Sequence, residues 1–300
     1  MQPLSRLTPD AARALAGVIF DLDDTVLDHG ALTEAAYGAL FRLRETGLAL
    51  IACTGRPAGW GEVIQRQWPI DATLAENGAI ALVREEAGPV GGPRPGPASS
   101  ASAGRVVRLD ALDRDARRAS RAELVALADD MVRRFPAAAL ADDNDQRVTD
   151  VTIDIGEHRQ VPREDVAQMR AELRERGVRT LLSSVHLHLT RDPSDKATGV
   201  VRLLSTRFGE DPTRARHRYA FVGDSGNDGV AFAAFAWTFG VANVRAHLGK
   251  LSVPPRFVAS HPMGRGFAEI AHRIVELRKN APEPSSPSAL RSAPHLSQVS

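Results

Sequence analysis

Short runs of apolar residues, each ending in polar or glycine-rich residues, recur along this chain of 300 residues. They lie at residues 18–20, 48–52, 73–75, 219–222, 237–241 and 256–259. Helix-like stretches lie between several of them, and one of these follows Thr33, a suitable N-cap, and ends at Gly47. Nearly continuous apolar strands that alternate with helices favour a parallel sheet covered by helices on both faces. We therefore expect a doubly wound α/β domain built from both ends of the chain, residues 17–84 and 190–278.

The middle of the chain has a different pattern. Two segments, residues 148–155 and 180–190, alternate apolar and polar side chains, and helix-like segments precede each of them. Alternation predicts strands with one buried and one solvated face. We expect residues 85–189 to form a second, α+β domain inserted into the first.

Two segments are expected to lie outside these two domains, and a third to form a flexible loop within the inserted domain. Residues 1–16 are predicted to be an N-terminal extension. Residues 88–104 are rich in Pro, Gly and Ser and predict a flexible loop, and residues 279–300 predict a disordered tail.

Composition excludes several classes of function. Lys and Arg number 38 against 37 Asp and Glu, so a net charge of +1 predicts no broad attraction to nucleic acid or to a membrane surface. The most apolar stretch, residues 229–244, is shorter than the roughly 20 residues of a spanning helix. Cys53 has no second cysteine to pair with and lies in an apolar run, which indicates a reducing compartment, by default the cytoplasm. The sequence carries no indication of oligomeric state.

Acidic residues cluster at the ends of two expected strands. In "GVIFDLDDTVLD" the apolar run ends at Asp21, Asp23 and Asp24, and in "FVGDSGND" it ends at Asp224, Asn227 and Asp228. Ligands of such sheets bind beyond the carboxyl ends of the strands. Repulsion between unit charges about 4 Å apart is roughly 4 kcal/mol at an effective dielectric constant near 20, so clustered carboxylates need a cation. Oxygen ligands from two strand ends suit magnesium, and the alternative is a solvated acidic turn.

Two further polar signals follow apolar segments. In "IACTGRP" Thr54 offers a hydroxyl, Gly55 allows close approach to its backbone N–H, and Pro57 suits the start of a helix. Lys196 in "DPSDKATG" is expected near the start of another helix and suits phosphate oxygens. Taken alone, each is commonplace in a turn or on a solvated face.

Together, "DLDDT", "TGR", the later Lys196 and "GDSGND" resemble, in order, the four motifs of the haloacid dehalogenase (HAD) superfamily of phosphotransferases. "AENGAI" is similar to a stretch that follows the second motif in the Cof-like branch, which includes sucrose-phosphate and mannosyl-3-phosphoglycerate phosphatases. The resemblance covers residues 18–80 and 191–277. It implies a Rossmann-like HAD core with an inserted α+β cap domain that covers the site.

The resemblance also implies roles for the motif residues. Asp21 would be the nucleophile and Asp23 the general acid and base. Magnesium would be held by Asp21, the Asp23 backbone carbonyl and Asp224. Phosphate would be bound by Thr54, Gly55 and Lys196.

Other motif residues would support these. Thr25 would brace the loop, while Asn227 and Asp228 would orient Lys196 or metal-bound water. Asp24 replaces a glycine that many relatives have, and we expect it to be a turn residue.

The predicted function is that of a magnesium-dependent phosphomonoester phosphatase acting on a small phosphorylated metabolite, either a sugar phosphate or a phosphoglycerate derivative. A phosphomutase and a non-catalytic HAD-fold binding protein remain alternatives. Candidate substrate selectors are Ser184, His186 and His188, with Thr152 beside them, although a solvated strand face would show the same alternation.

Overall fold

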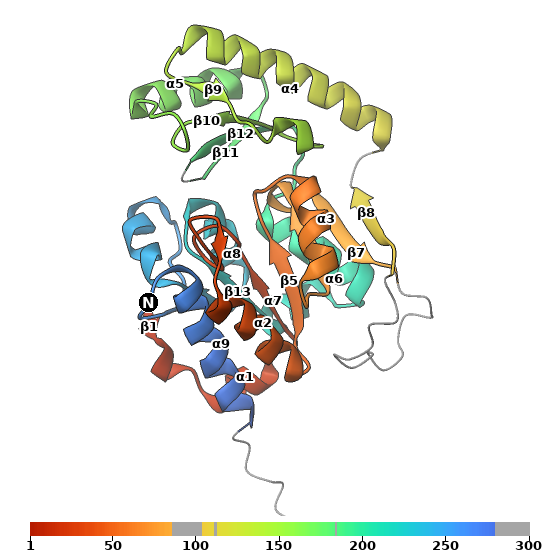
Figure 1. Ribbon diagram of the computed structural model, residues 1–300, viewed down its shortest axis with the longest axis vertical. Helices are drawn as coiled ribbons and strands as arrows, with labels where there is room; N and C mark the ends of the chain where they lie inside the picture. The colour runs from red at the N-terminus through yellow and green to blue at the C-terminus, as the bar shows by residue number, and fades with distance from the viewer. Residues whose placement is uncertain (86–103, 111–112, 184, 280–300) are drawn as a thin grey trace, which may run out of the picture.

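The apolar runs form strands of one nine-stranded sheet in the computed structural model, which describes residues 1–85, 104–110, 113–183 and 185–279 (Figure 1). Its strands, in order across the sheet, are β1 (Gln2–Pro3), β15 (Phe257–Val258), β14 (Trp237–Gly240), β13 (Tyr219–Gly223), β2 (Gly17–Phe20), β5 (Ala49–Cys53), β6 (Ala72–Ala75), β7 (Ile80–Arg84) and β8 (Val106–Asp110). In this spatial order, the first seven strands, which end with β6, pair in parallel with their neighbours. The last two, β7 and β8, add an antiparallel edge. The predicted α/β fold class with a parallel-dominated sheet is confirmed.

Helices cover both faces of this sheet. We call the sheet and these helices together the core. They are α1 (Pro9–Ala14), α2 (Glu34–Glu45), α3 (Ala58–Gln67), α6 (Lys196–Phe208), α7 (Pro212–Arg218), α8 (Gly229–Ala234) and α9 (Met263–Lys279). Alternate residues of β2 enter different apolar clusters: Phe20 packs with residues of α1, α2 and α9, and Ile19 with residues of α6, α7 and α8. The sequence directs this layering because the central strands, β13, β2, β5 and β6, are buried on both faces.

A second, four-stranded sheet forms the cap above the core (Figure 1). Its antiparallel strands are, in order, β11 (Arg179–Leu182), β12 (His186–Thr190), β10 (Val151–Asp154) and β9 (Ala139–Leu140), and its helices are α4 (Arg114–Arg134) and α5 (Arg163–Glu175). One face of the sheet packs against both helices through an apolar cluster that includes Leu124, Ile153 and Leu187. Figure 1 shows the sheet between these helices and the core, so its polar face is directed toward the core.

Two segments differ from the expected domain division. β8 was expected in the inserted domain, but it extends the core sheet, with Val107 paired with Val83. Residues 1–16 are not a separate extension, because β1 pairs with β15 and Leu4 and Leu7 are buried in the core. Both segments carry apolar side chains that pack against the core: Leu4 and Leu7 are buried, and Val107 and Leu109 are partly buried.

The strand expected over residues 180–190 is in fact a hairpin, β11 and β12, that turns near Ser183. The face expected to be solvated is also buried at Asp150, Thr152 and His188. Alternation separates apolar from polar side chains correctly, but the core covers the polar side. The candidate selector Ser184, residues 88–103 of the expected loop and residues 280–300 of the expected tail lie outside the described residues.

Short elements complete the chain and carry several site residues. They are the hairpin of β3 (Leu27–Asp28) and β4 (Ala31–Leu32), and the 3-10 segments at Leu4–Arg6, Glu76–Gly78, Asn144–Gln146, Gly226–Asp228 and Ala242–Lys250. Within the described ranges, no helix combines the length and apolar character that crossing a membrane requires.

Candidate active site

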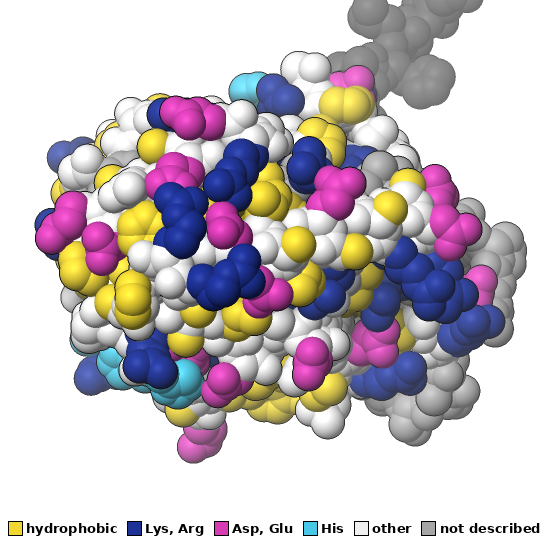
Figure 2. All heavy atoms as spheres, turned by 90° about the horizontal axis from the view of Figure 1, so that it is seen from above, with side chains coloured by type: hydrophobic (Ala, Val, Ile, Leu, Met, Phe, Trp, Pro, Cys, Tyr) yellow, Lys and Arg dark blue, Asp and Glu magenta, His cyan; other side chains and the backbone are white. Residues whose placement is uncertain are grey.

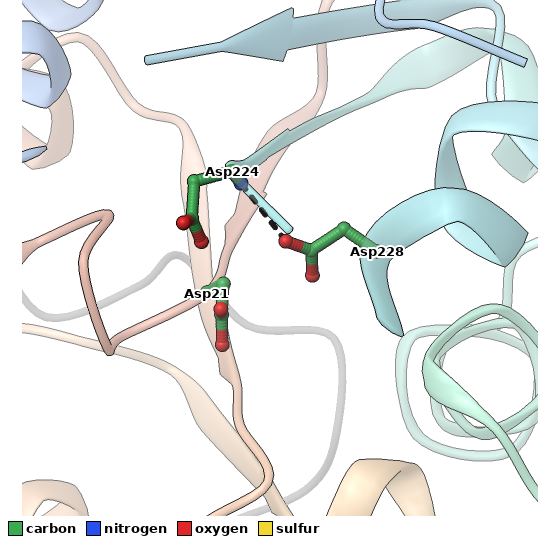
Figure 3. A group of neighbouring side chains, drawn as sticks. All are labelled: Asp21, Asp224 and Asp228. Atoms are coloured by element: carbon green, nitrogen blue, oxygen red, sulfur yellow. Dashed lines mark hydrogen bonds between the residues drawn. The ribbon is translucent and has the colours of Figure 1, made fainter. Parts of the chain in front are cut away.

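Asp21 and Asp224 lie at the ends of two neighbouring parallel strands. Asp21 directly follows β2, Asp224 directly follows β13, and Phe20 pairs with Val222 in the register. Because the carboxyl ends of parallel strands meet at one edge of a sheet, the two side chains come together although they are far apart in the chain. Figure 3 shows their carboxylates beside that of Asp228, which reaches them from the turn after β13.

These three carboxylates form a buried cluster. Each offers an oxygen, and the three oxygens lie within 4.8 Å of one another. Lys196, at the start of α6, is also buried, and its Nζ lies 2.7 Å from Asp21 Oδ1 and 2.7 Å from Asp228 Oδ1. Three carboxylates against one ammonium leave an excess of negative charge.

Burial and the excess negative charge raise the pKa values of two of these carboxyl groups, Asp21 and Asp224. Burial, with the charge of Asp228 added, raises the pKa of Asp21 to about 7 even though Lys196 opposes the shift. Burial and the charges of Asp228 and Asp21 raise the pKa of Asp224 to about 9. A divalent cation would relieve both effects, and carboxylate oxygens suit a hard cation such as magnesium. The residues present therefore fit the metal that the resemblance implies.

Two side chains hold Asp224 in place. The Thr25 hydroxyl donates to Asp224 Oδ1 at 3.1 Å, and Asn243 Nδ2 donates to Asp224 Oδ2 at 2.9 Å. Asn243 also donates to the Asp24 carbonyl at 2.9 Å, which joins the two acid-bearing loops. The sequence analysis missed Asn243, although its place shortly after β14, another strand that ends at the same edge, was a usable signal.

Asp23 is more exposed than Asp21 and is paired with an arginine. Arg56 Nε and Nη2 donate to its carboxylate at 2.6 to 3.0 Å, and Arg56 also lies 4.0 Å from the centre of the Trp60 ring. Arg56 belongs to the quoted "TGR" motif, but no role was predicted for it. The neighbouring Asp24 has φ of 54°, which confirms its prediction as a turn residue.

The loop after β5 brings Gly55 to the cavity but turns Thr54 inward. Thr54 is fully buried, and its hydroxyl accepts a hydrogen bond from Arg56 N at 3.0 Å. A Cβ at Gly55 would lie 3.3 Å from Asn77 Oδ1 and 3.5 Å from His188 Cε1, so only glycine leaves this approach fully open.

Asn227 and Asp228, which were predicted to orient Lys196 or metal-bound water, differ in their hydrogen bonds. Asn227 Oδ1 accepts from the Ser225 hydroxyl at 2.7 Å, and its Nδ2 donates to Asn77 Oδ1 at 3.3 Å. Asp228 Oδ1 accepts from Lys196 Nζ at 2.7 Å, and the backbone N–H groups of Asp224 and Ser225 donate to Asp228 Oδ2 at 2.9 and 3.1 Å.

Glu76, in the quoted "AENGAI" stretch, ties the core to the cap. Its buried carboxylate accepts backbone N–H groups from Ala58 in the core and from residues 148–150 in the cap, at 2.6 to 3.2 Å, and the Thr149 hydroxyl at 2.5 Å. Glu76 and Asn77 both have positive φ, 50° and 56°, an uncommon and strained arrangement for two successive residues. The sequence analysis gave Glu76 no role, because these partners lie far along the chain.

Arg147 forms a second link between cap and core, and the sequence analysis missed it too. Its side chain is 1% exposed and donates to the Gly55 carbonyl at 3.1 Å, to Asp143 at 2.6 Å and to Asp150 at 3.0 Å. Asp150 also contacts His188 Nδ1 at 2.9 Å. Burial opposes ionisation of Asp150, but Arg147 and His188 outweigh it and hold its pKa at about 2.

A cavity of about 280 Å³ lies between the core and the cap. The acid-bearing strand ends form its floor, with Asp21, Asp224, Gly55 and the Asp23–Arg56 pair. The cap forms its roof with Asp142, Asp143, Arg147, Glu157, His158, His186 and His188. Two candidate selectors, His186 and His188, thus line the cavity, whereas Thr152 and the predicted phosphate ligand Thr54 are buried beside it.

Comparison with known families agrees with this arrangement. The family of haloacid dehalogenase-like hydrolases matches residues 18–89, which include the three acidic residues of the first motif and the "TGR" loop. No curated protein matches the sequence significantly.

Solved structures match over most of the chain. A Thermoplasma acidophilum protein has a TM-score of 0.64 at 18% identity, covering 88% of this chain and 99% of its own. The Synechocystis sucrose-phosphatase, solved with sucrose and phosphate, has a TM-score of 0.59 at 21% identity, covering 87% of this chain and 98% of its own. A HAD phosphatase of Bacteroides thetaiotaomicron has a TM-score of 0.58 at 16% identity, covering 91% and 98%. The chain therefore resembles haloacid dehalogenase-like hydrolases in sequence over residues 18–89 and shares the fold of HAD phosphatases over most of its length.

Proposed function

We propose that the protein is a magnesium-dependent phosphatase that hydrolyses phosphate monoesters of small metabolites through an aspartyl-phosphate on Asp21. One observation carries the proposal: Asp21, held by the buried Lys196, lies with Asp224 at the floor of a cavity closed by the cap. A sugar phosphate or a phosphoglycerate derivative is the proposed class of substrate. The sugar-phosphate class is supported by the Synechocystis neighbour, a sucrose-phosphatase whose structure was solved with sucrose and phosphate.

In the first step, an Asp21 carboxylate oxygen attacks phosphorus and the bond to the leaving oxygen breaks. Lys196 and the Gly55 N–H stabilise the negative charge of the phosphoryl oxygens. The Thr54 hydroxyl, which is buried beside the cavity, joins them only if the loop after β5 shifts when substrate enters. Asp23 donates a proton to the leaving oxygen. Because Arg56 occupies both Asp23 oxygens, this role requires the Asp23–Arg56 pair to shift when substrate enters.

In the second step, water attacks phosphorus, Asp23 accepts its proton, and the bond between phosphorus and Asp21 breaks to release inorganic phosphate. Bound magnesium, held by Asp21, Asp224 and the Asp23 carbonyl, would supply positive charge that offsets repulsion between Asp21 and the phosphate dianion. Asp228 keeps Lys196 positioned.

The test is a phosphate-release screen over a metabolite panel with magnesium, run on the wild type and on Asp21→Asn. We expect steady release of inorganic phosphate by the wild type and a loss of at least about 10³-fold in Asp21→Asn, because removing a nucleophile eliminates the covalent route. Asp24→Asn is the matched control in the same loop, and asparagine tolerates its positive φ. Near wild-type release by folded Asp21→Asn would overturn the proposal, and isomerised sugar phosphate without phosphate release would indicate a mutase.

A further inference from the structure

We infer that the roof of the cavity selects phosphate esters whose leaving group is an uncharged or aminated alcohol and rejects those whose leaving group carries a carboxylate. The inference rests on the proposed function. Of the two substrate classes named there, it favours sugar phosphates over phosphoglycerate derivatives. It follows from the charges of the cap residues that face the cavity.

Acidic side chains dominate this roof. Asp142, Asp143 and Glu157 line the cavity, and Asp150 lies directly behind Arg147. Among the described lining residues of the cap, Arg147 is the single arginine or lysine. The three lining carboxylates and Asp150 face one guanidinium, so the roof together with Asp150 has a formal charge of −3 when the histidines are neutral.

The positive charge of Arg147 is already committed. Its guanidinium contacts Asp143 at 2.6 Å and Asp150 at 3.0 Å, and its side chain is 1% exposed. Arg147 therefore cannot neutralise a carboxylate on the substrate without breaking a bidentate pair. The other arginine that lines the cavity, Arg56, belongs to the floor, where the proposed reaction releases it from Asp23 beside the phosphoryl group and not at the roof.

Two roof carboxylates, by contrast, remain open to a ligand. The side chains of Asp142 and Glu157 are 90% and 48% exposed, and each contacts a histidine: Asp142 lies 3.8 Å from His158 Nε2 and Glu157 lies 2.8 Å from His186 Nε2. With His158 and His186 both protonated, the roof together with Asp150 would still have a formal charge of −1. Hydroxyl and ammonium groups can donate to these oxygens, whereas a carboxylate in a cavity of about 280 Å³ would face like charge.

The bias is a property of the cavity and not of the whole surface. The face of the molecule seen from above carries basic and acidic side chains interspersed (Figure 2). The chain as a whole has a net charge of +1. Rejection of acidic leaving groups is therefore local, and salt will weaken it only in part.

The experiment compares three substrates that differ in charge at the far end: glucosamine 6-phosphate, glucose 6-phosphate and gluconate 6-phosphate. We expect kcat/KM for gluconate 6-phosphate to be lower than for glucose 6-phosphate by roughly tenfold or more, since like charges are costly in a confined site. Glucosamine 6-phosphate should match or exceed glucose 6-phosphate.

The double variant Asp142→Asn/Glu157→Gln keeps the shape of the roof and removes two charges. The rate ratio of gluconate 6-phosphate to glucose 6-phosphate should rise severalfold in this variant. Glu164→Gln/Glu175→Gln is the matched control, because it also removes two charges, at exposed positions of α5 outside the cavity. Thermal unfolding verifies that all variants are folded.

p-Nitrophenyl phosphate separates failure of the inference from failure of the proposed function, because its leaving group is small and carries no carboxylate. If p-nitrophenyl phosphate is hydrolysed, two outcomes would overturn the inference alone. One is equal rates on the three sugar esters, and the other is an unchanged rate ratio of gluconate 6-phosphate to glucose 6-phosphate in the double variant. No phosphate release from any ester would overturn both.

Discussion

The floor and the roof of the cavity are both charged, but they are built in opposite ways. On the floor, Asp21, Asp228 and Lys196 are almost completely buried and contact one another directly. On the roof, the buried Arg147 pairs with Asp143 and with Asp150 behind it, whereas Asp142 and Glu157 are exposed. A reaction common to many substrates needs a fixed floor, whereas discrimination between substrates can be placed in side chains that remain free to meet them.

The largest effect is expected on the floor, from Lys196→Met. It removes the lysine that contacts Asp21 and leaves the acids uncompensated, so phosphate release should fall about 10³-fold and, without magnesium, the free energy of unfolding should fall by about 4 kcal/mol. Kinetics and urea denaturation measure the two effects.

Lys279→Met, at the exposed end of α9, is the control for Lys196→Met and should change neither quantity. Wild-type stability and rate in Lys196→Met would show that the floor does not depend on this ion pair.

A smaller loss of stability is expected on the roof, from Arg147→Met. The variant leaves Asp150 buried with His188 alone and removes the contact with the Gly55 carbonyl, so the free energy of unfolding should fall by about 3 kcal/mol. KM should rise more than kcat falls, because the roof positions substrate and does not touch the phosphoryl group. Arg174→Met on the exposed side of α5 is the control, and a kcat loss as large as that of Lys196→Met would remove the distinction between floor and roof.

The floor was largely predictable because its residues lie directly at strand ends. Asp21 and Asp224 follow apolar strands, parallel strands bring their ends to one edge, and the four motifs placed Lys196 with them. Thr54 was predicted from the same kind of signal, but the backbone after β5 turns its hydroxyl toward Arg56 N. Its contact with phosphate remains a prediction.

The roof was less predictable because its residues depend on partners from distant segments. Alternation in β12 placed His186 and His188 on one face, but it could not show that the core covers that face or that Arg147 and Asp150 lie there. Glu76 shows the same limit, since its partners are backbone N–H groups of the cap, which carry no side-chain signature.

The central claim is that the acids of the floor form one site for a divalent cation. The dependence of the free energy of unfolding on pH tests this claim most directly. With EDTA, the raised pKa values of Asp21, about 7, and Asp224, about 9, mean that the folded protein holds protons that the unfolded chain releases above its ordinary value of 3.8. The contribution of these two groups to stability is therefore complete below about pH 4 and is lost as pH rises toward 9.

Magnesium competes with these protons, so it should stabilise the protein increasingly from pH 5 to pH 9, by about 2.7 kcal/mol at a hundredfold excess over its Kd. Urea denaturation of the wild type and of Asp224→Asn, with EDTA and with magnesium, measures this. We predict a magnesium-dependent gain at pH 9 in the wild type that Asp224→Asn loses; equal stability of the wild type with EDTA and with magnesium at every pH would contradict the account.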